Sequence, residues 1–472
     1  MNPTSTPPRA GNPFVVLAVI ASATLMIVLD ASIINIALPR AQASLGLSDT
    51  ARPWVITAYA LSFGGLLLLG GRLGDRFGHR RMFLLGLAGF ALASGLGGVA
   101  ASGTTLILAR ALQGVFGAIL APAALALLTT TFTSPEDRAR AFAVYGAVQG
   151  LGGAVGLLLG GVLTEYLGWR WCLYINLPIA LIVALVALRT LPPSLERTRA
   201  KLDLLGALLS VTGLAAVVYG LTVAGEGGAE THPALASATI LTGVALLALF
   251  LLRQSRARNP LLPLSIPADR NRATAFLSMA LIGAGMFGML MFLAFYLQSV
   301  LAFSPLATGL AFLPFSVGIV LGSSLASKLM QRLGNSRTMW IGLLGAAVGM
   351  MWLVPVGAGP GFWTQVLPAL CVMSFGLGVY FVPASSSALT GVRDEESGVA
   401  SALVNVTQQV GGSIGPALLN TIFLMATAAT PGIGLQTPEG YRAAFGAAAV
   451  LFLVALIVVL VLPRRASRRT AA

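Results

Sequence analysis

Charge is scarce in this sequence. Only 9% of its 472 residues are Asp, Glu, Lys or Arg, and 57% are hydrophobic, whereas about a quarter of the residues in a soluble domain are charged. Mean hydropathy is +0.88. A chain with so few charges cannot cover the surface of a soluble fold. The composition therefore predicts a membrane protein.

Cysteine and histidine are also rare. The two cysteines, Cys172 and Cys371, fall at or within hydrophobic segments, and the two histidines, His79 and His232, are isolated. This pattern predicts no disulfide and no metal site. The sequence also has no phosphate-binding loop and no catalytic group of acids. We therefore expect neither a cofactor nor an enzyme.

Long hydrophobic runs are what the sequence does contain, and a membrane-spanning helix needs about 20 such residues. Fourteen runs qualify: 14–38, 52–71, 82–101, 104–131, 140–163, 170–190, 202–224, 234–252, 273–299, 305–327, 338–356, 361–390, 398–425 and 441–462. The linkers between them are too short for a soluble domain. The sequence predicts an all-α polytopic membrane protein with 14 transmembrane helices.

The basic residues fall mainly on one side of the predicted membrane. With the N-terminus inside, 24 of the 29 Lys and Arg residues lie in cytoplasmic segments. Four lie outside, namely Arg40, Arg52, Arg170 and Arg442, and Arg110 lies within a span. The positive-inside rule then predicts a multi-pass protein of the inner (plasma) membrane with both termini in the cytoplasm. It also explains the net charge of +14 without nucleic-acid binding.

Two spans in the middle of the chain have the character of an insert. The linkers on either side of them, 189–203 and 253–272, are basic and contain proline. Without the insert, six spans remain on each side, which is typical of a transporter with its cavity between two halves. We predict an N-terminal six-helix half at 1–190, a linker with two inserted transmembrane helices at 191–260, and a C-terminal six-helix half at 261–472.

The segment Gly71-Arg72-Leu73-Gly74-Asp75-Arg76-Phe77-Gly78-His79-Arg80-Arg81 is the strongest local motif. Its glycines permit a tight cytoplasmic turn, its aspartate suits the start of the third helix, and its arginines suit an anionic lipid surface. The residues expected to act as a conformational switch are Gly71, Gly74, Asp75, Arg76, Gly78 and Arg80. A simple positive-inside turn is the alternative interpretation.

Asp30 is the only acid placed well inside a span, and Arg110 is the only base so placed. A charge at such a position costs at least about 2.5 kcal/mol and indicates function by default. Asp30 lies about 12 Å from the outer end of the first span and Arg110 about 9 Å into the fourth, at 1.5 Å per residue. The two can therefore meet, either for proton coupling or as a structural ion pair.

These motifs resemble those of the major facilitator superfamily. Residues 71–80 match its signature loop, G-x-L-x-D-R-x-G-R-K, at Gly71, Leu73, Asp75, Arg76 and Gly78. The 14 spans and the segment LDASIINIALP at 29–39 resemble the drug/proton antiporter branch of the EmrB/QacA type, whose motif is L-D-x-T-I-V-N-V-A-L-P. The run from Arg110 to Gly114 is similar to the family's R-x-x-Q-G. This likeness implies that Arg110 takes part in proton transfer.

Glycines recur every four residues in the fifth span, at Gly152, Gly156 and Gly160, and form a smooth face for helix packing. Together with Gly161 they are similar to the family's antiporter motif, G-x-x-x-G-P-x-x-G-G. Leu157 stands where that motif has proline. General small-residue packing, without an antiport role, is the alternative.

Amide and adaptable apolar side chains at membrane depth are expected to face a substrate cavity. The candidates are Asn35, Gln113, Gln149, Phe287, Phe292, Tyr296, Gln298, Asn405, Gln408 and Gln409. Ordinary packing or hydrogen bonding between helices is the alternative for each of them.

Three acids, Asp394, Glu395 and Glu396, precede the thirteenth span. The pseudo-symmetry of the two halves places them near Arg76, Arg80 or Arg81 of the 71–81 motif. We predict that these charges latch the halves together when the cavity opens outward. Favourable interaction with the helix dipole is the structural alternative.

Together these patterns predict a proton-coupled efflux transporter, an antiporter that exports drugs or other small lipophilic or cationic compounds. Its energy source is the proton gradient, Asp30 is the proton carrier, and the protein is expected to be a monomer in the bilayer. One alternative is a specific exporter of a metabolite or self-made antibiotic on the same fold. Another is a membrane sensor that does not transport, against which Asp30, Arg110 and the 71–81 motif argue.

Overall fold

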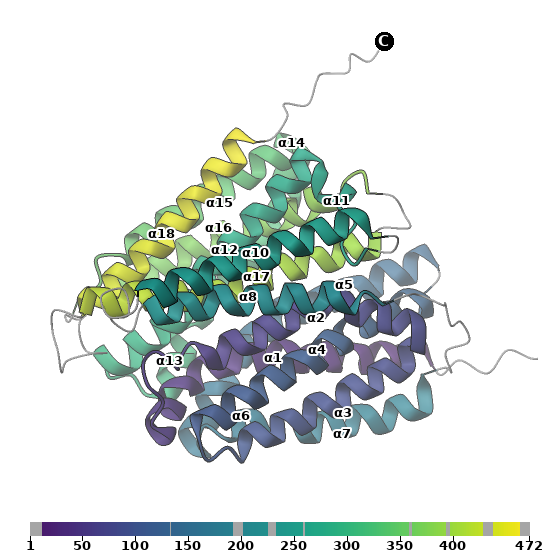
Figure 1. Ribbon diagram of the computed structural model, residues 1–472, viewed down its shortest axis with the longest axis horizontal. Coiled ribbons are helices and arrows are strands. Elements are labelled where there is room, and N and C mark those ends of the chain that lie inside the picture. The colour runs from purple at the N-terminus through teal and green to yellow at the C-terminus, as the bar shows by residue number, and fades with distance from the viewer. Residues whose placement is uncertain are drawn as a thin grey trace, which may run out of the picture.

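The structure, a computed structural model, describes residues 12–132, 134–191, 202–224, 233–257, 260–357, 361–392, 397–427 and 438–462. In these ranges it is entirely helical (Figure 1). The elements are α1 (Pro13–Leu45), α2 (Trp54–Phe77), α3 (His79–Gly98), α4 (Gly103–Thr131), α5 (Pro135–Tyr166), α6 (Trp171–Tyr174), α7 (Asn176–Thr190), α8 (Leu204–Val223), α10 (Pro233–Arg256), α11 (Ser265–Ala268), α12 (Arg270–Phe295), a π-helical turn η2 (Tyr296–Val300), α13 (Pro305–Ala311), α14 (Leu313–Leu333), α15 (Asn335–Leu353), a second π-helical turn η3 (Phe362–Val366), α16 (Leu367–Leu389), α17 (Ser397–Thr427) and α18 (Pro438–Val461).

Local sequence signals determine where α1 begins and ends. Pro13 occupies its first turn, where a missing N–H is tolerated, and the Asn12 side chain accepts a hydrogen bond from the Phe14 N–H. The helix stops at Gly46, which adopts the left-handed conformation with φ 61° and donates its N–H to the Gln42 carbonyl. The 33-residue helix between these signals is long enough to cross a bilayer.

Twelve helices in the described part of the chain are long and apolar enough to span a membrane. The predicted spans 140–163 and 338–356 coincide with α5 and α15, which are not among those twelve. In α5, several of whose side chains lie outside the described residues, the apolar portion found is Val155–Tyr166. The prediction of a helical, multi-pass membrane bundle is confirmed, whereas the number of 14 spans is not.

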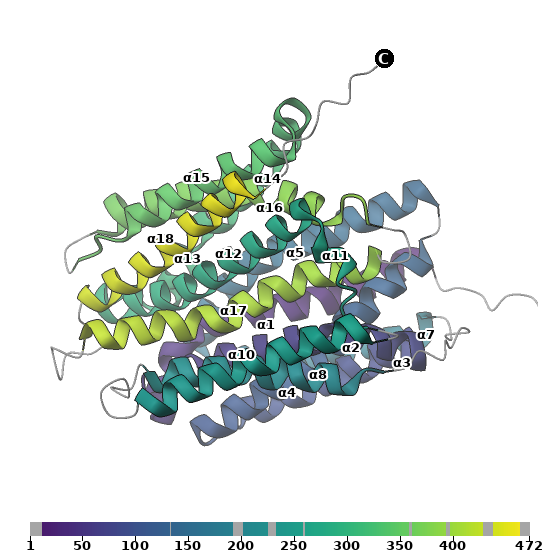
Figure 2. The same ribbon diagram turned by 45° about the horizontal axis from the view of Figure 1, so that its top comes forward.

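The helices gather in two groups. In Figures 1 and 2, α1–α7 lie together, α12–α18 lie together on the other side, and α8 and α10 run side by side along the boundary. Leu214 and Val218 of α8 share an apolar cluster with Leu61 of α2 and Ala417 of α17. The α8–α10 pair therefore contacts both groups through α8.

A polar clamp holds α8 to α10. Asp203 Oδ1 accepts hydrogen bonds from the Gly206 N–H at 2.9 Å and from Arg253 Nε at 2.7 Å, and its Oδ2 accepts one from Gln254 Nε2 at 2.9 Å. Gln254 Oε1 in turn accepts from the Leu262 N–H at 3.1 Å. Burial alone would raise the pKa of Asp203, but these hydrogen bonds and the charge of Arg253 hold it below its ordinary value.

Asp203→Asn should lower the free energy of unfolding by about 1–3 kcal/mol, because an amide leaves the donors of the clamp partly unsatisfied. Since the pKa of Asp203 is lower in the folded protein, its contribution is complete above the unfolded value of about 3.9 and is lost as the pH falls through the lowered value. Thermal unfolding in detergent between pH 7 and 3 measures both effects. Glu439→Gln, which removes an exposed ion pair with Arg442, is the control. Equal unfolding temperatures for wild type and Asp203→Asn would contradict this role.

Candidate functional site

Asp30 and Arg110, which the sequence predicts at similar depth, meet in the structure. Arg110 Nη1 of α4 lies 2.5 Å from Asp30 Oδ2 of α1, and the two side chains are 1% and 0% exposed. A buried ion pair is tolerable only when its remaining polar atoms also find partners. The surrounding helices supply them.

Both carboxylate oxygens of Asp30 are occupied by donors. Besides the Arg110 contact at Oδ2, Oδ1 accepts from Gln113 Nε2 at 3.0 Å and from Asn176 Nδ2 at 2.8 Å. An ionised carboxylate only accepts hydrogen bonds, so this arrangement fits the charged form of Asp30. Gln113 was predicted to line the cavity. That assignment is wrong, because its amide is turned toward the ion pair.

Arg110 is held from three further directions. Its Nε donates to the Val55 carbonyl at 3.2 Å, its Nη1 also donates to Gln113 Oε1 at 2.9 Å, and its Cζ lies 4.4 Å from the centre of the Tyr59 ring. The ring contact is a cation–π interaction between two buried side chains. The guanidinium therefore keeps several partners besides Asp30.

Asn176 also belongs to this site, although the sequence does not predict it. It is the first residue of α7, and its Nδ2 also donates to Ser94 Oγ at 2.9 Å, which donates to the Leu173 carbonyl at 2.7 Å. The sequence predicts one uniform span at 170–190, whereas the structure divides these residues between α6 and α7. The position of Asn176 at the start of a helix therefore could not be predicted. The signal available was a single asparagine in an otherwise apolar segment.

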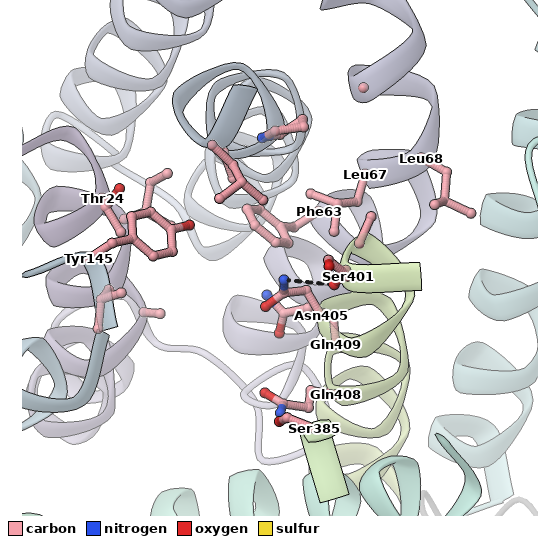
Figure 3. Close-up of a pocket in the computed structure, with 18 of the residues that line it drawn as sticks. Thr24, Phe63, Leu67, Leu68, Tyr145, Ser385, Ser401, Asn405, Gln408 and Gln409 are labelled. Atoms are coloured by element: carbon pink, nitrogen blue, oxygen red, sulfur yellow. Dashed lines mark hydrogen bonds between the residues drawn. The ribbon is translucent and has the colours of Figure 1, made fainter. Parts of the chain in front are cut away.

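A cavity of about 1050 Å³ lies between the two groups of helices (Figure 3). Its wall is formed by residues of α1, α2, α3, α4, α5, α12, α14, α16 and α17 and of the segment before α11. Among the described residues none of those lining it belongs to α8 or α10. The Cβ that a side chain would need at Gly213 or Gly220 of α8 instead meets Leu247 or Ile240 of α10. The pair α8–α10 thus lies outside the cavity.

Half of the predicted cavity residues do line it. These are Asn35, Phe287, Asn405, Gln408 and Gln409. Figure 3 shows the amides of the last three projecting from α17. The side chain of Gln149 lies outside the described residues.

Three aromatic or polar candidates near the end of α12 do not line the cavity. Phe292 is fully buried against other rings, Tyr296 Oη donates to the Gly357 carbonyl at 2.6 Å, and Gln298 Nε2 donates to the Ile36 carbonyl at 3.1 Å. The helical period turns Phe287 toward the cavity and carries the later residues to positions that pack on α17, α18 and α1. Placing them in the cavity was wrong.

The end of the cavity near the α1–α2 connection is closed by Arg52. This side chain is fully buried, and its Cζ lies 4.6 Å from the ring centre of Phe295, 5.4 Å from that of Phe292 and 5.5 Å from that of Phe423. Its Nη2 donates to Asn420 Oδ1. From the sequence alone, Arg52 is expected only to be an outer basic residue. Its burial depends on rings that lie far away in the chain.

Other contacts between the two helix groups reinforce this closure. Asn420 Nδ2 donates to the Asp49 carbonyl at 3.0 Å, and Thr57 Oγ1 donates to the Ser413 carbonyl at 3.2 Å. The Leu306 N–H donates to Glu165 Oε2 at 2.9 Å. By contrast the opposite part of the cavity reaches Arg72, Asp75 and His79 at the α2–α3 connection. The structure is therefore closed at one end, with its cavity directed toward the other.

The 71–81 motif is more helical than predicted. Helix α2 continues to Phe77 and α3 begins at His79, so only Gly78, with φ 95°, separates them. Gly71 and Gly74 lie inside α2, and Asp75 is in its last turn, where its Oδ1 is 3.7 Å from His79 Nε2. The predicted place of Asp75 at the start of the third helix is wrong. A single glycine with positive φ suffices for the turn.

Arginines of this motif are anchored to backbone carbonyls. Arg72 Nη2 donates to the Pro260 carbonyl at 3.3 Å and Arg80 Nη2 to the Leu188 carbonyl at 2.6 Å. Arg76 lies over the ring of Phe77. The acids of the predicted latch, Asp394, Glu395 and Glu396, lie outside the described residues. The latch therefore stays a prediction.

Three of the α5 glycines face α1. A Cβ at Gly156 would lie 3.1 Å from the Leu29 carbonyl oxygen, one at Gly160 would lie 3.0 Å from that of Ile33, and Gly152 faces Val28. Close packing of α5 therefore fixes the segment of α1 that carries Asp30. Gly161 instead faces α13, where a Cβ would lie 2.7 Å from the Pro305 carbonyl oxygen.

An all-helical bundle with a closed end, a central cavity and a buried ion pair beside it defines a multi-pass membrane transporter of small molecules. Residues 20–416 match the Major Facilitator Superfamily, and the chain belongs to this family. It is 49% identical over 455 residues to the puromycin resistance protein pur8 of Streptomyces alboniger, covering 93% of this chain and 90% of that protein. It is 37% identical to the cephamycin export protein CmcT of Amycolatopsis lactamdurans, covering 95% and 92% of the two chains.

The fold agrees with that of solved transporters. A bacterial homologue of the human lysosomal transporter Spinster superposes with a TM-score of 0.67 at 17% identity, covering 95% of this chain and 96% of that one. The superfamily membership and the exporting relatives confirm the prediction of an efflux transporter and not an enzyme.

The shared acceptor on Asp30 predicts that Gln113 and Asn176 act together in stabilising the fold. Gln113→Ala and Asn176→Ala should each lower the free energy of unfolding by about 1–3 kcal/mol. The double variant should lose more than the sum, because only then is Oδ1 left without a donor. Thermal unfolding in detergent measures all three. Asn335→Ala, which removes a hydrogen bond to Ser386 far from the ion pair, serves as control, and strictly additive effects would contradict the shared site.

Proposed function

We propose that this transporter is a proton-coupled antiporter of the fourteen-span drug-export branch, the EmrB/QacA type. It lies in the cell membrane with both termini in the cytoplasm, and α5 and α15 complete the set of fourteen spans. It exports drug-like or antibiotic-like compounds and draws energy from the proton gradient. The observation that carries this proposal is a buried Asp30–Arg110 pair set beside the cavity but not in its wall.

Proton binding at Asp30 is proposed to act through helix positions and not through direct competition with substrate. Asp30 faces α4 and α7, while Ile27, Val28 and Ala31 of the same helix line the cavity. A proton on Asp30 removes the countercharge of Arg110 and one acceptor of the surrounding amides. Since buried unpaired groups are unfavourable, α1 and α4 then favour a different relative position.

Alternating access follows from the asymmetry of the two ends. With the N-terminus in the cytoplasm, the α2–α3 connection is cytoplasmic and the present structure is open inward. Opening to the outside requires Arg52 to leave the rings of Phe292, Phe295 and Phe423. In this scheme the proton enters from outside when that end is open and leaves Asp30 on the cytoplasmic side.

Two substrate ranges are candidates, namely many lipophilic drugs or a single antibiotic. The cavity volume of about 1050 Å³ is at the upper end of small-molecule sites, about 300–1,000 Å³, and supports a broad range of lipophilic drugs. The near full-length similarity to a puromycin resistance protein and a cephamycin export protein favours a narrower role, export of one antibiotic. Transport assays with puromycin, a cephamycin and the dye ethidium separate the two, since a specific exporter accepts only one.

Asp30→Asn should fold but abolish pH-driven efflux. The Asn oxygen still accepts from Arg110, and Arg110 keeps Gln113, the Val55 carbonyl and the Tyr59 ring as partners. No side chain at the site can then bind and release a proton, so the pH gradient cannot drive transport. The measurement is puromycin and ethidium flux in proteoliposomes with an imposed pH gradient.

Asp269→Asn, an exposed cap at the start of α12, is the matched control and should transport normally. Arg110→Ala should also be inactive, and activity restored in Arg110→Lys would show that charge matters more than the guanidinium fork. Full gradient-driven transport by Asp30→Asn would overturn the proton-coupling role.

Arg52→Gln should shift the protein toward a conformation open at the α1–α2 end. It removes a desolvated cation–π contact worth about 2 kcal/mol, enough to change a two-state ratio more than tenfold. Spin labels at Ser48 and Ala426 should report a longer distance in this variant than in wild type. Arg170→Gln is the control, because Arg170 lies at the same end but donates to Ala100 within its own helix group. An unchanged distance distribution would refute the role of Arg52 in keeping the α1–α2 end closed.

A further inference from the structure

One atom at the Asp30 site has no hydrogen-bond partner among the described residues. It is Oδ1 of Asn176, a fully buried residue at the start of α7. The other end of the same amide is fully used, because its Nδ2 donates to Asp30 Oδ1 at 2.8 Å and to Ser94 Oγ at 2.9 Å. A buried polar atom without a partner is rare in native proteins and calls for an explanation.

The charge of Asp30 determines which end of the Asn176 amide can face it. A carboxylate only accepts hydrogen bonds, so the nitrogen end must point toward it, as it does here. A protonated carboxyl carries an O–H, which needs an acceptor instead. A half-turn of the amide about its Cβ–Cγ bond places Oδ1 where Nδ2 now lies. Since Oδ1 has no described partner, the oxygen loses no hydrogen bond in this turn.

Gln113, the other amide that donates to Asp30 Oδ1, is fixed at both ends. Its Nε2 donates to Asp30 at 3.0 Å, and its Oε1 accepts from Arg110 Nη1 at 2.9 Å. A half-turn would direct its NH₂ group at the guanidinium, which also only donates. Of the two amides, Asn176 is therefore the one that can reverse.

Two further titratable groups lie close enough to Asp30 to interact with its charge. They are the hydroxyl of Tyr59 on α2 and the thiol of Cys172 on α6. Neither makes a hydrogen bond to Asp30 in the described structure, since Tyr59 Oη has no partner there and Cys172 Sγ pairs with Thr164 Oγ1 at 3.2 Å. Beside the Arg110 guanidinium of α4, the amide of Asn176 is thus already in contact with the carboxylate, whereas these two groups are not.

Ser94 on α3 stabilises the present orientation of the Asn176 amide. Its Oγ accepts from Asn176 Nδ2 and donates to the Leu173 carbonyl at 2.7 Å, so it makes two hydrogen bonds. Beside a turned amide it makes only one, because its single proton goes either to Asn176 Oδ1 or to Leu173. Ser94 therefore favours the return of the amide once the proton has left Asp30.

We propose that Asn176 is a positioning residue for proton coupling, whose amide turns over when a proton binds Asp30 Oδ1. In the turned state Asn176 Oδ1 accepts the new O–H, and Ser94 no longer bridges the amide to Leu173. Since Asn176, Ser94 and Leu173 belong to α7, α3 and α6, protonation changes contacts of three helices that do not carry the ion pair. This inference rests on the proposed proton coupling at Asp30.

Puromycin flux in proteoliposomes tests the proposal when the pH is varied on the side that corresponds to the cell exterior. In Asn176→Leu, which keeps the size of the side chain, charged Asp30 retains Gln113 and Arg110 as donors. The protonated form instead has a buried O–H without an acceptor, which is the more costly loss. Half-maximal flux should therefore require about tenfold more protons, a move of about one pH unit toward acid.

Ser94→Ala should move the pH of half-maximal flux in the opposite direction, by about two- to fivefold in proton concentration. The present arrangement loses two hydrogen bonds in this variant, whereas the turned arrangement loses only one. The matched controls are Asn335→Leu and Ser386→Ala, which disrupt an asparagine–serine hydrogen bond of 3.1 Å between α15 and α16. Neither control should move the pH of half-maximal flux.

Nuclear magnetic resonance of isotope-labelled asparagine in wild-type protein provides a second measurement that does not depend on the stability of a variant. The side-chain carbonyl carbon of Asn176 should shift as the pH is lowered, because its oxygen gains a hydrogen bond, and should not shift in Asp30→Asn. The Asn420 carbonyl, which already accepts from Arg52 while its Nδ2 donates to Asp49, is the internal control.

The outcomes separate this role from the coupling on which it rests. A purely structural role of Asn176 and Ser94 would lower flux at every pH and leave its midpoint unchanged, which would overturn the inference. So would midpoints that move in the same direction in both variants, or an Asn176 carbonyl signal that does not respond to pH. Wild-type flux that is insensitive to a pH gradient would instead overturn the proposed proton coupling at Asp30.

Discussion

The ion pair between Asp30 and Arg110 determines how closely the neighbouring helices must pack. Two opposite charges in a medium of low dielectric constant attract strongly, but removing them from water is unfavourable unless every remaining polar atom is satisfied. Helices α1, α4 and α7 must therefore approach closely enough for Gln113 and Asn176 to reach one oxygen. The glycine face of α5 against α1 permits this approach. The N-terminal helices thus form a tightly determined unit around a single carboxylate.

The two ends of the molecule are held by different forces. At the α1–α2 end, a buried guanidinium among aromatic rings joins helices of both groups, and dispersion and cation–π attraction act together there. At the α2–α3 end, one described contact between α2 and the segment before α11 is a hydrogen bond from the partly exposed Arg72 side chain to the Pro260 carbonyl. Such contacts are weaker in water.

Much of the fold is predictable because a long apolar run can be recognised directly in the sequence. Every predicted span coincides with helical structure. The meeting of Asp30 with Arg110 is predictable for a related reason, since a lone charge at membrane depth needs a partner. The direction in which an amide points is not predictable in this way. The Gln113 amide turns to the ion pair, whereas the Asn35 Nδ2 donates to carbonyls of its own helix. Arg52 is buried by rings of α12 and α17, and a contact so distant in the chain leaves no local pattern.

Helix α8 covers one of the two seams where the helix groups meet, since it packs on both α2 and α17. The other seam, where α5 meets α13 and α14, has no such cover among the described helices. In the described part of the chain, the two flanks that face the lipid are therefore unequal: α8 lies over one seam, and the other is formed by α5 against α13 and α14.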